Sequence, residues 1–148
     1  MAKRIDIETI KPHVGASYPA PFDAPCRERE RRALGDAAGL TAFGVNLLKL
    51  PPGAWSSQRH WHSKEEEFVY VIAGEVVLVT DAGEETLRAG DAAGFRGGEQ
   101  NGHHLQNRTN KDAIVLEVGD RRSELVVYPD IDLEVDDQGY KHRDGRPY

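Results

Sequence analysis

Runs of apolar residues along the chain predict a series of short β-strands. Each run is rich in valine, leucine, isoleucine or aromatic residues and is bounded by glycine, proline or charged residues. The predicted strands cover residues 41–50, 67–73, 75–80, 84–87, 92–95, 103–107 and 113–118, with a hairpin turn at 81–83. No stretch shows a convincing helical period. Many short strands at regular spacing predict an all-β sandwich or barrel.

The strand over residues 67–73 is apolar on both faces. Val69 and Val71 share the face that begins with a glutamate, while the opposite face carries Phe68, Tyr70 and Ile72. One face is expected to line the barrel interior. The other face requires an outer layer, either the N-terminal segment of the chain or a second subunit. We therefore expect a homodimer.

The segments on either side of the barrel differ from it in composition. Residues 1–39 are predicted to form an extended N-terminal arm and a first strand, because prolines interrupt the first 26 residues. Residues 40–120 form the barrel, and residues 121–148 a polar tail over its surface, within a single domain overall. The charged run at 27–32 is interpreted as a solvated strand or turn rather than as a basic patch.

The overall composition excludes several classes of protein. The chain has 148 residues, of which 39 % are hydrophobic and 30 % are charged, as is typical of a globular domain. Its net charge of −6 argues against nucleic-acid binding, and no apolar run approaches the ~20 residues of a membrane span. Cys26 is the only cysteine and the first ten residues lack an apolar signal core, so we expect a cytoplasmic protein.

A cluster of potential metal ligands falls in two short windows. His60 and His62, two residues apart, lie on the same face of a strand, and the carboxylates of residues 65–67 follow at once. The second window holds His103 and His104, of which only one can point inward. A buried glutamate needs a cation or hydrogen bonds to stay charged, and a metal held by imidazoles would supply that cation. Parity and spacing alone leave open which glutamate and which second-window histidine take part.

These windows resemble the two sequence motifs of the cupin superfamily, and the flanks resemble those of small bacterial single-domain cupins. The motif positions are Gly53, His60, His62, Glu67 and Gly74 in the first window, and Gly90, Gly98, His103 and Asn107 in the second. Two spacings depart from the motifs. Six residues rather than five separate Gly53 from His60, and four rather than two separate Gly98 from His103. In addition, Arg96 stands where the motif has proline.

The resemblance implies a double-stranded β-helix, or jelly-roll barrel, with one divalent metal near its mouth. It implies His60, His62, Glu67 and His103 as the ligands. Three imidazoles and a carboxylate leave open positions on an octahedral ion, which favours Mn²⁺, Fe²⁺ or Ni²⁺, with Zn²⁺ as an alternative.

Function is expected to involve a small polar metabolite, and the reaction stays open. A metal-dependent isomerase or epimerase, or a dioxygenase, is the first hypothesis, and a non-catalytic binding module (a sensor or carrier) is the alternative. Gln58, Arg59 and Arg96 are weak candidates for holding an anionic substrate. Glu117 is a candidate general base, although a residue of this kind more often pairs with a nearby cation.

Overall fold

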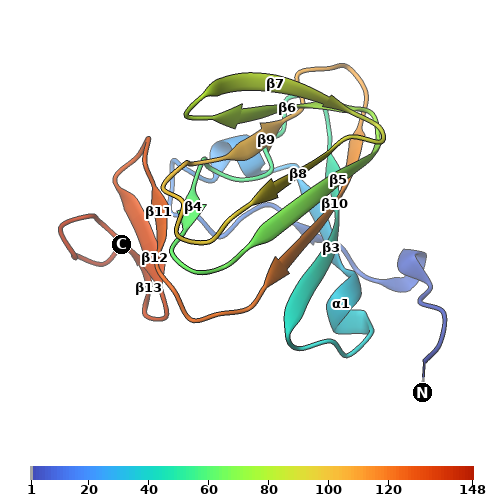
Figure 1. The fold of residues 1–148 in the computed structure, drawn as a ribbon, viewed down its shortest axis with the longest axis horizontal. Coiled ribbons are helices and arrows are strands. Elements are labelled where there is room, and N and C mark those ends of the chain that lie inside the picture. Colours follow the sequence, from blue (N-terminus) through green and yellow to red (C-terminus); the bar gives the residue numbers. More distant parts are fainter. Residues whose placement is uncertain (1) are drawn as a thin grey trace.

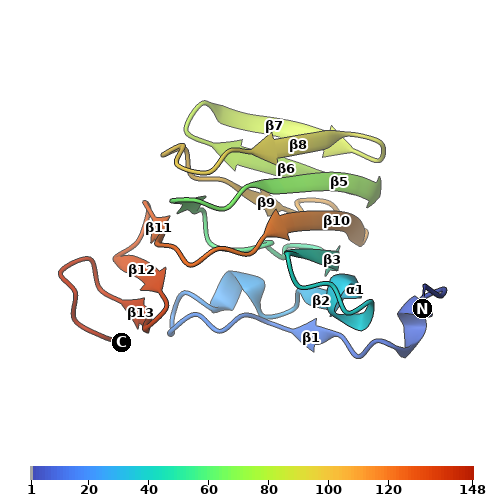
Figure 2. The ribbon, with the colours of Figure 1, turned by 60° about the horizontal axis from the view of Figure 1, so that its bottom comes forward.

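Two antiparallel sheets face each other in the computed structural model, which describes residues 2–148 (Figures 1 and 2). In spatial order, the larger sheet comprises β1 (His13–Val14), β2 (Glu30–Ala33), β3 (Phe43–Leu50), β10 (Ala113–Asp120), β5 (Glu67–Ala73) and β8 (Ala92–Phe95). The smaller sheet comprises β7 (Gly83–Arg88), β6 (Glu75–Thr80) and β9 (His104–Gln106). The predicted all-β architecture is therefore confirmed.

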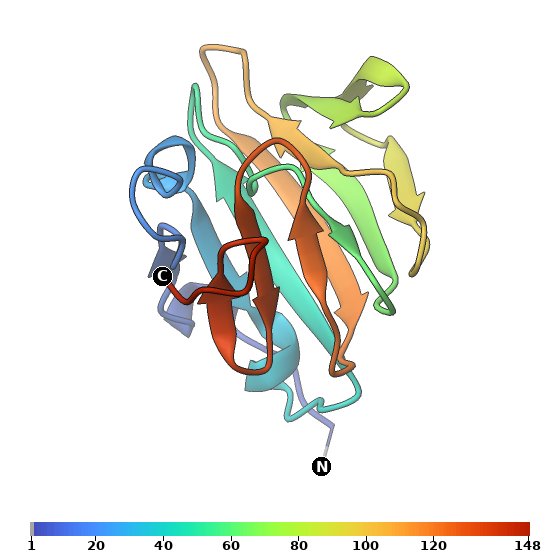
Figure 3. The ribbon, with the colours of Figure 1, turned by 90° about the vertical axis from the view of Figure 1, so that its left-hand side faces the viewer.

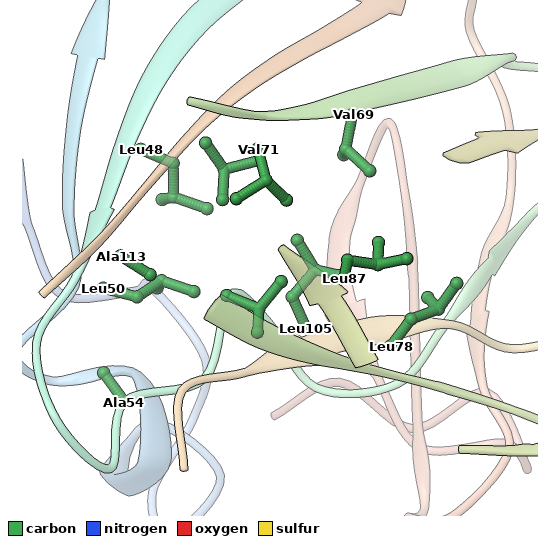
Figure 4. Packing of buried hydrophobic residues seen from close by; sticks show 11 residues of the cluster. Leu48, Leu50, Ala54, Val69, Val71, Leu78, Leu87, Leu105 and Ala113 are labelled. Atoms are coloured by element: carbon green, nitrogen blue, oxygen red, sulfur yellow. The ribbon is translucent and has the colours of Figure 1, made fainter. Parts of the chain in front are cut away.

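The core lies between these two sheets. Val69 and Val71 of β5 are buried on its inner face, as the alternating pattern predicts. Leu78, Leu87 and Leu105 approach them from the facing sheet (Figure 4). Burial of this apolar surface, at roughly 25 cal/mol per Å², is the main force that holds the two sheets together.

A single glycine carries the chain from one sheet to the other. Gly74 separates β5 from β6 and has a φ of +76°, a left-handed conformation that suits glycine. A Cβ atom at this position would lie 2.6 Å from the carbonyl oxygen of Asp112. The next connection is the predicted hairpin, in which Thr80 pairs with Gly83 across a two-residue turn.

The N-terminal segment extends the larger sheet at its edge. Its elements are η1 (Ile7–Thr9), β1, η2 (Ala24–Cys26) and β2, and a one-turn helix, α1 (Leu34–Ala37), follows. Because β2 pairs with β3, this segment does not cover the outer face of β5. Phe68, Tyr70 and Ile72 are 45, 41 and 47 % exposed, so the arm is not their outer layer. Residue 1 of the predicted arm lies outside the described residues.

The C-terminal segment is more ordered than the predicted polar tail. It forms β11 (Val126–Tyr128), β12 (Leu133–Asp136) and β13 (Gly139–Lys141), which join β4 (Trp61–His62) in a third sheet (Figure 3). Val126 pairs with His62, so this segment lies directly beside the first histidine window. Within residues 2–148, no helix has the length and apolar character needed to cross a membrane.

Candidate metal centre

Three separate parts of the chain position the four predicted ligands. His62 lies in β4 with His60 just before it, Glu67 is the first residue of β5, and His103 immediately precedes β9. The backbones of His60 and His103 hydrogen-bond to each other in both directions, with N···O distances of 3.2 and 2.9 Å. This bridge brings the two histidine windows together.

The side chains of these four residues converge. The Nε2 atoms of His60 and His62 lie 3.1 Å apart, and Oε1 of Glu67 lies 3.2 Å from His62 Nε2. The other carboxylate oxygen of Glu67 lies 2.6 Å from Nε2 of His103. Ligand atoms of His60, His62 and Glu67 all fall within 4.8 Å of one another. Imidazole nitrogens and a carboxylate so arranged are a donor set that suits a divalent transition metal.

The adjacent histidines of the second window point to different places. His103 stacks on Phe95, with ring centroids 3.6 Å apart, and its Nε2 faces the cluster. His104 instead places Nδ1 2.8 Å from the carbonyl oxygen of Ser57, and its ring packs edge-on against Trp55. The structure therefore places His103, rather than His104, with the other predicted ligands.

Hydrogen bonds on the far side of two rings fix their orientation. His60 Nδ1 donates to the carbonyl oxygen of Gln58 at 2.8 Å, which leaves Nε2 with a lone pair toward the cluster. His62 Nδ1 contacts the carboxylate of Glu124. The second oxygen of Glu124 accepts the backbone N–H groups of Lys64 and Glu65, both at 2.9 Å.

Glu124 was not among the residues that the sequence singles out. Its side chain is only 6 % exposed, although it belongs to the acid-rich segment that follows the barrel. A run of acidic residues gives no signal for which member is buried. The contact depends on the pairing of β11 with β4, which brings the C-terminal segment to His62.

The charges of the cluster depend strongly on one another. Burial alone would raise the pKa of Glu67, but hydrogen bonds with His103, His60 and His62 hold that pKa well below its usual value. Burial alone would lower the pKa of His62, but Glu67 and Glu124 together raise it to about 9. Burial lowers the pKa of His103. The cluster thus contains an ionised carboxylate that a bound cation would further stabilise.

A cavity of about 280 Å³ opens beside the cluster. Phe95, Val69 and Leu105 contribute apolar walls, while Arg31 and Glu117 contribute charged groups. Nε of Arg31 lies 2.7 Å from a carboxylate oxygen of Glu117, so Glu117 pairs with a cation as the more common interpretation predicts.

The three weak substrate-binding candidates lie elsewhere. Gln58 donates to the carbonyl oxygen of Phe22 at 2.8 Å and so ties the N-terminal segment to the barrel. Arg59 forms a two-point ion pair with Asp130 at 2.8 Å and also contacts Asp81. Arg96 lines neighbouring surface hollows. None of the three lines the cavity beside the cluster, within the part of the chain that the structure describes.

Arg31 of β2 and Arg29, just before that strand, line this cavity and were not singled out from the sequence. Both belong to the charged run predicted to be solvated, yet Arg29 is only 7 % exposed. The available signal was the alternation of arginine and glutamate, which places residues 29 and 31 on one face of a strand and residues 28 and 30 on the other.

Comparisons with known proteins agree with this architecture. The model of the cupin domain family matches residues 46–119. A crystal structure of a sugar phosphate isomerase from a cupin superfamily, from Silicibacter pomeroyi, is 42 % identical, with a TM-score of 0.93 over 99 % of this chain and 96 % of that chain. A predicted oxalate decarboxylase from Thermotoga maritima is 25 % identical, with a TM-score of 0.65 over 81 % of this chain and 100 % of that chain.

A more distant structure shows the fold alone. A polyketide cyclase from Streptomyces resistomycificus is 22 % identical, with a TM-score of 0.65 over 81 % of this chain and 80 % of that chain. A search of curated proteins finds no match. The jelly-roll barrel expected from the sequence is confirmed, and the chain belongs to the cupin superfamily.

Proposed function

We propose that this protein is a metal-dependent enzyme that acts on a small polar metabolite, with an isomerisation or epimerisation as the favoured reaction. The observation that carries the proposal is the convergence of His60, His62, His103 and Glu67 at the wall of a cavity. The similarity to a sugar phosphate isomerase at 42 % identity supports an isomerase more than an oxygenase.

The donor set suits a single divalent ion. His60, His62, His103 and Glu67 would hold it, and no cysteine belongs to the cluster, so Mn²⁺, Fe²⁺ or Ni²⁺ is favoured over Zn²⁺. A bound ion would polarise an oxygen of the substrate and so make an adjacent proton easier to remove.

The residues of the chain supply the remaining requirements. Phe95 and Leu105 exclude water from one side of the cavity, which strengthens electrostatic interactions inside it. Glu117 is the proposed proton acceptor, because its carboxylate lines the cavity beside the cluster.

Metal analysis tests the proposal directly. The purified protein is expected to hold about one divalent ion per chain, and His60→Ala to lose it, because the substitution removes one of four donors. His13→Ala is the matched control, since His13 is an exposed histidine of β1 away from the cluster. A screen of small polyols and sugars for isomerised products then compares the two variants. Equal turnover by His60→Ala and His13→Ala would exclude metal catalysis at this site.

A second candidate function is a binding module without turnover. The ion pair of Glu117 with Arg31 favours it, because the pair occupies the carboxylate that would otherwise accept a proton from the substrate. Ligand-dependent thermal stabilisation without any product would support this alternative, and measurable turnover would exclude it.

A further inference from the structure

Two arginines line the cavity from β2, the second strand of the larger sheet, and from the residue just before it. Arg29 and Arg31 are two residues apart in the charged run that ends in β2, and both reach the cavity. Glu117 of β10 and Glu67 of β5 are the carboxylates that line the same cavity. The cavity therefore has a cationic side that the metal cluster does not use.

The guanidinium of Arg31 is poorly satisfied by the protein. Its Nε atom lies 2.7 Å from Glu117, but the atoms are not aligned for a hydrogen bond, and this buried nitrogen has no other partner among residues 2–148. No guanidinium nitrogen of Arg31 donates an aligned hydrogen bond within that range. A flat guanidinium with free donors binds carboxylate or phosphate oxygens in a two-point fashion.

Arg29 adds a second positive charge without a negative partner. Its side chain donates to the carbonyl oxygens of Gly15, at 3.0 Å, and of Ser56. No carboxylate lies within ion-pair distance of it in residues 2–148. Burial makes its charged form costly and lowers its pKa. A nearby anion would offset this cost.

The charge balance of the cavity points the same way. Two arginines and two glutamates cancel formally, and the imidazoles of the cluster are neutral when they bind a metal. The divalent ion of the proposed function would then leave the cavity with a net positive charge, which a dianionic ligand neutralises and a monoanionic ligand reduces by half.

We propose that Arg31, supported by Arg29, binds the anionic group of the substrate, a carboxylate or a phosphate, while another oxygen of the same molecule faces the metal cluster. This assignment deepens the proposed function and rests on it. Glu117 pairs with Val69, two residues along β5 from Glu67. One strand spacing and two residues of rise place the Cα atoms of Glu117 and Glu67 roughly 8 Å apart. A short-chain acid or phosphate ester spans that distance.

Binding of three matched probes tests the assignment. Glycerol, glycerate and glycerol 3-phosphate share a three-carbon skeleton and differ in the neutral, carboxylate or phosphate group at one end. Titration calorimetry on the Mn²⁺-loaded protein is expected to show at least tenfold tighter binding for one of the anions than for glycerol. The anion that binds tighter identifies the preferred group. If neither exceeds glycerol, the proposal is overturned.

Variants of the two members of the Arg31–Glu117 ion pair are expected to change anion affinity in opposite directions. Arg31→Gln is expected to lose the preference for the anion, and Arg31→Lys to retain part of it. Glu117→Gln is expected to raise anion affinity several-fold, because it removes a competing carboxylate. Arg108→Gln is the control, since Arg108 forms a similar ion pair with Glu84 on the exposed surface. Unchanged anion affinity in Arg31→Gln would overturn the proposal.

A second variant and the metal content of each sample cover the remaining outcomes. If Arg31→Gln does not fold, Glu117→Gln decides alone, and a loss of anion affinity in that variant contradicts the proposal. Metal content is measured on the same samples. Anion binding that depends on Arg31 in a protein that takes up no metal would support the subsite and refute the metal enzyme. Metal uptake without any preference for anions would refute the anion subsite and leave the metal enzyme supported.

Discussion

Glu124 links the C-terminal segment to the histidine cluster through its contact with His62. Its carboxylate is buried and is held by the backbone N–H groups of Lys64 and Glu65, so its position is well defined. A carboxylate in this position keeps a hydrogen on Nδ1 of the imidazole and leaves Nε2 free to bind a metal.

Glu124→Gln is therefore expected to weaken metal binding by roughly 10- to 100-fold, because a neutral amide holds the imidazole less firmly. Competition with a chelator measures the dissociation constant. Glu134→Gln is the control, because Glu134 of β12 lies in the same segment and pairs with Val127 of β11 and Lys141 of β13. Equal metal affinity in both variants would show that the contact with His62 is not needed.

Cys26 gives a prediction about pH. Its side chain is fully buried, and desolvation raises the pKa of its thiol to about 11. Because the pKa is raised, the folded state favours the neutral thiol. The contribution of Cys26 to the free energy of unfolding is therefore complete at neutral pH and is lost as the pH rises toward 11. Alkylation of the native protein at pH 8 is expected to be at least tenfold slower than in denaturant. Equal rates would mean that Cys26 is accessible in the folded protein.

Gly74 governs the change of sheet between two elements. The chain leaves β5 and enters β6 through this one residue, whose left-handed φ and close approach to the Asp112 carbonyl both exclude a side chain. The position is part of the first sequence motif, and its role here is to join the sheet that carries Glu67 to the facing sheet.

Gly74→Ala is expected to lower the free energy of unfolding by at least about 1–3 kcal/mol, the usual cost of a strained backbone, with the steric clash in addition. Gly90→Ala is the matched control, because Gly90 has a φ of +95° but open space around its Cβ position. Chemical denaturation of both variants separates the two effects. A loss in Gly74→Ala no greater than in Gly90→Ala would show that the clash relaxes.

The outer face of the larger sheet bears on how whole molecules associate. Phe68, Tyr70 and Ile72 remain exposed there, and Leu116 of β10 and Leu47 of β3 lie in the same row as Tyr70. Contiguous apolar surface of this kind is typical of a protein interface. We propose that a second copy of the chain covers it, as the two apolar faces of β5 predict.

Sedimentation at micromolar concentration is expected to show a dimer, and Tyr70→Glu to weaken the dimer at least tenfold, because it places a charge in the apolar face. Val14→Glu is the control, since Val14 is exposed on β1, at the far edge of the same sheet. A monomeric mass for the unaltered protein would refute the proposal.

Local patterns in the sequence predict the barrel strands well. The strands over 67–73, 75–80 and 92–95 have the predicted bounds, and the hairpin turn lies where aspartate and glycine indicate it. Such features depend on neighbouring residues, because side-chain alternation and turn geometry extend over only a few positions. The choice between His103 and His104 depended on motif spacing, since parity alone left it open.

Only the tertiary structure decides which distant segments meet. The pairing of β11 with β4 brings Glu124 to His62, and the pairing of β2 with β3 turns Arg31 into the cavity. Short acidic or mixed-charge segments carry no pattern that names their partner, because the pairing depends on the whole packed barrel. The sequence by itself determined the central strands of the barrel, and its resemblance to the cupin motifs pointed to the four residues whose side chains converge. The fold decided what surrounds them, because burial and charge pairing arise between residues far apart in the chain.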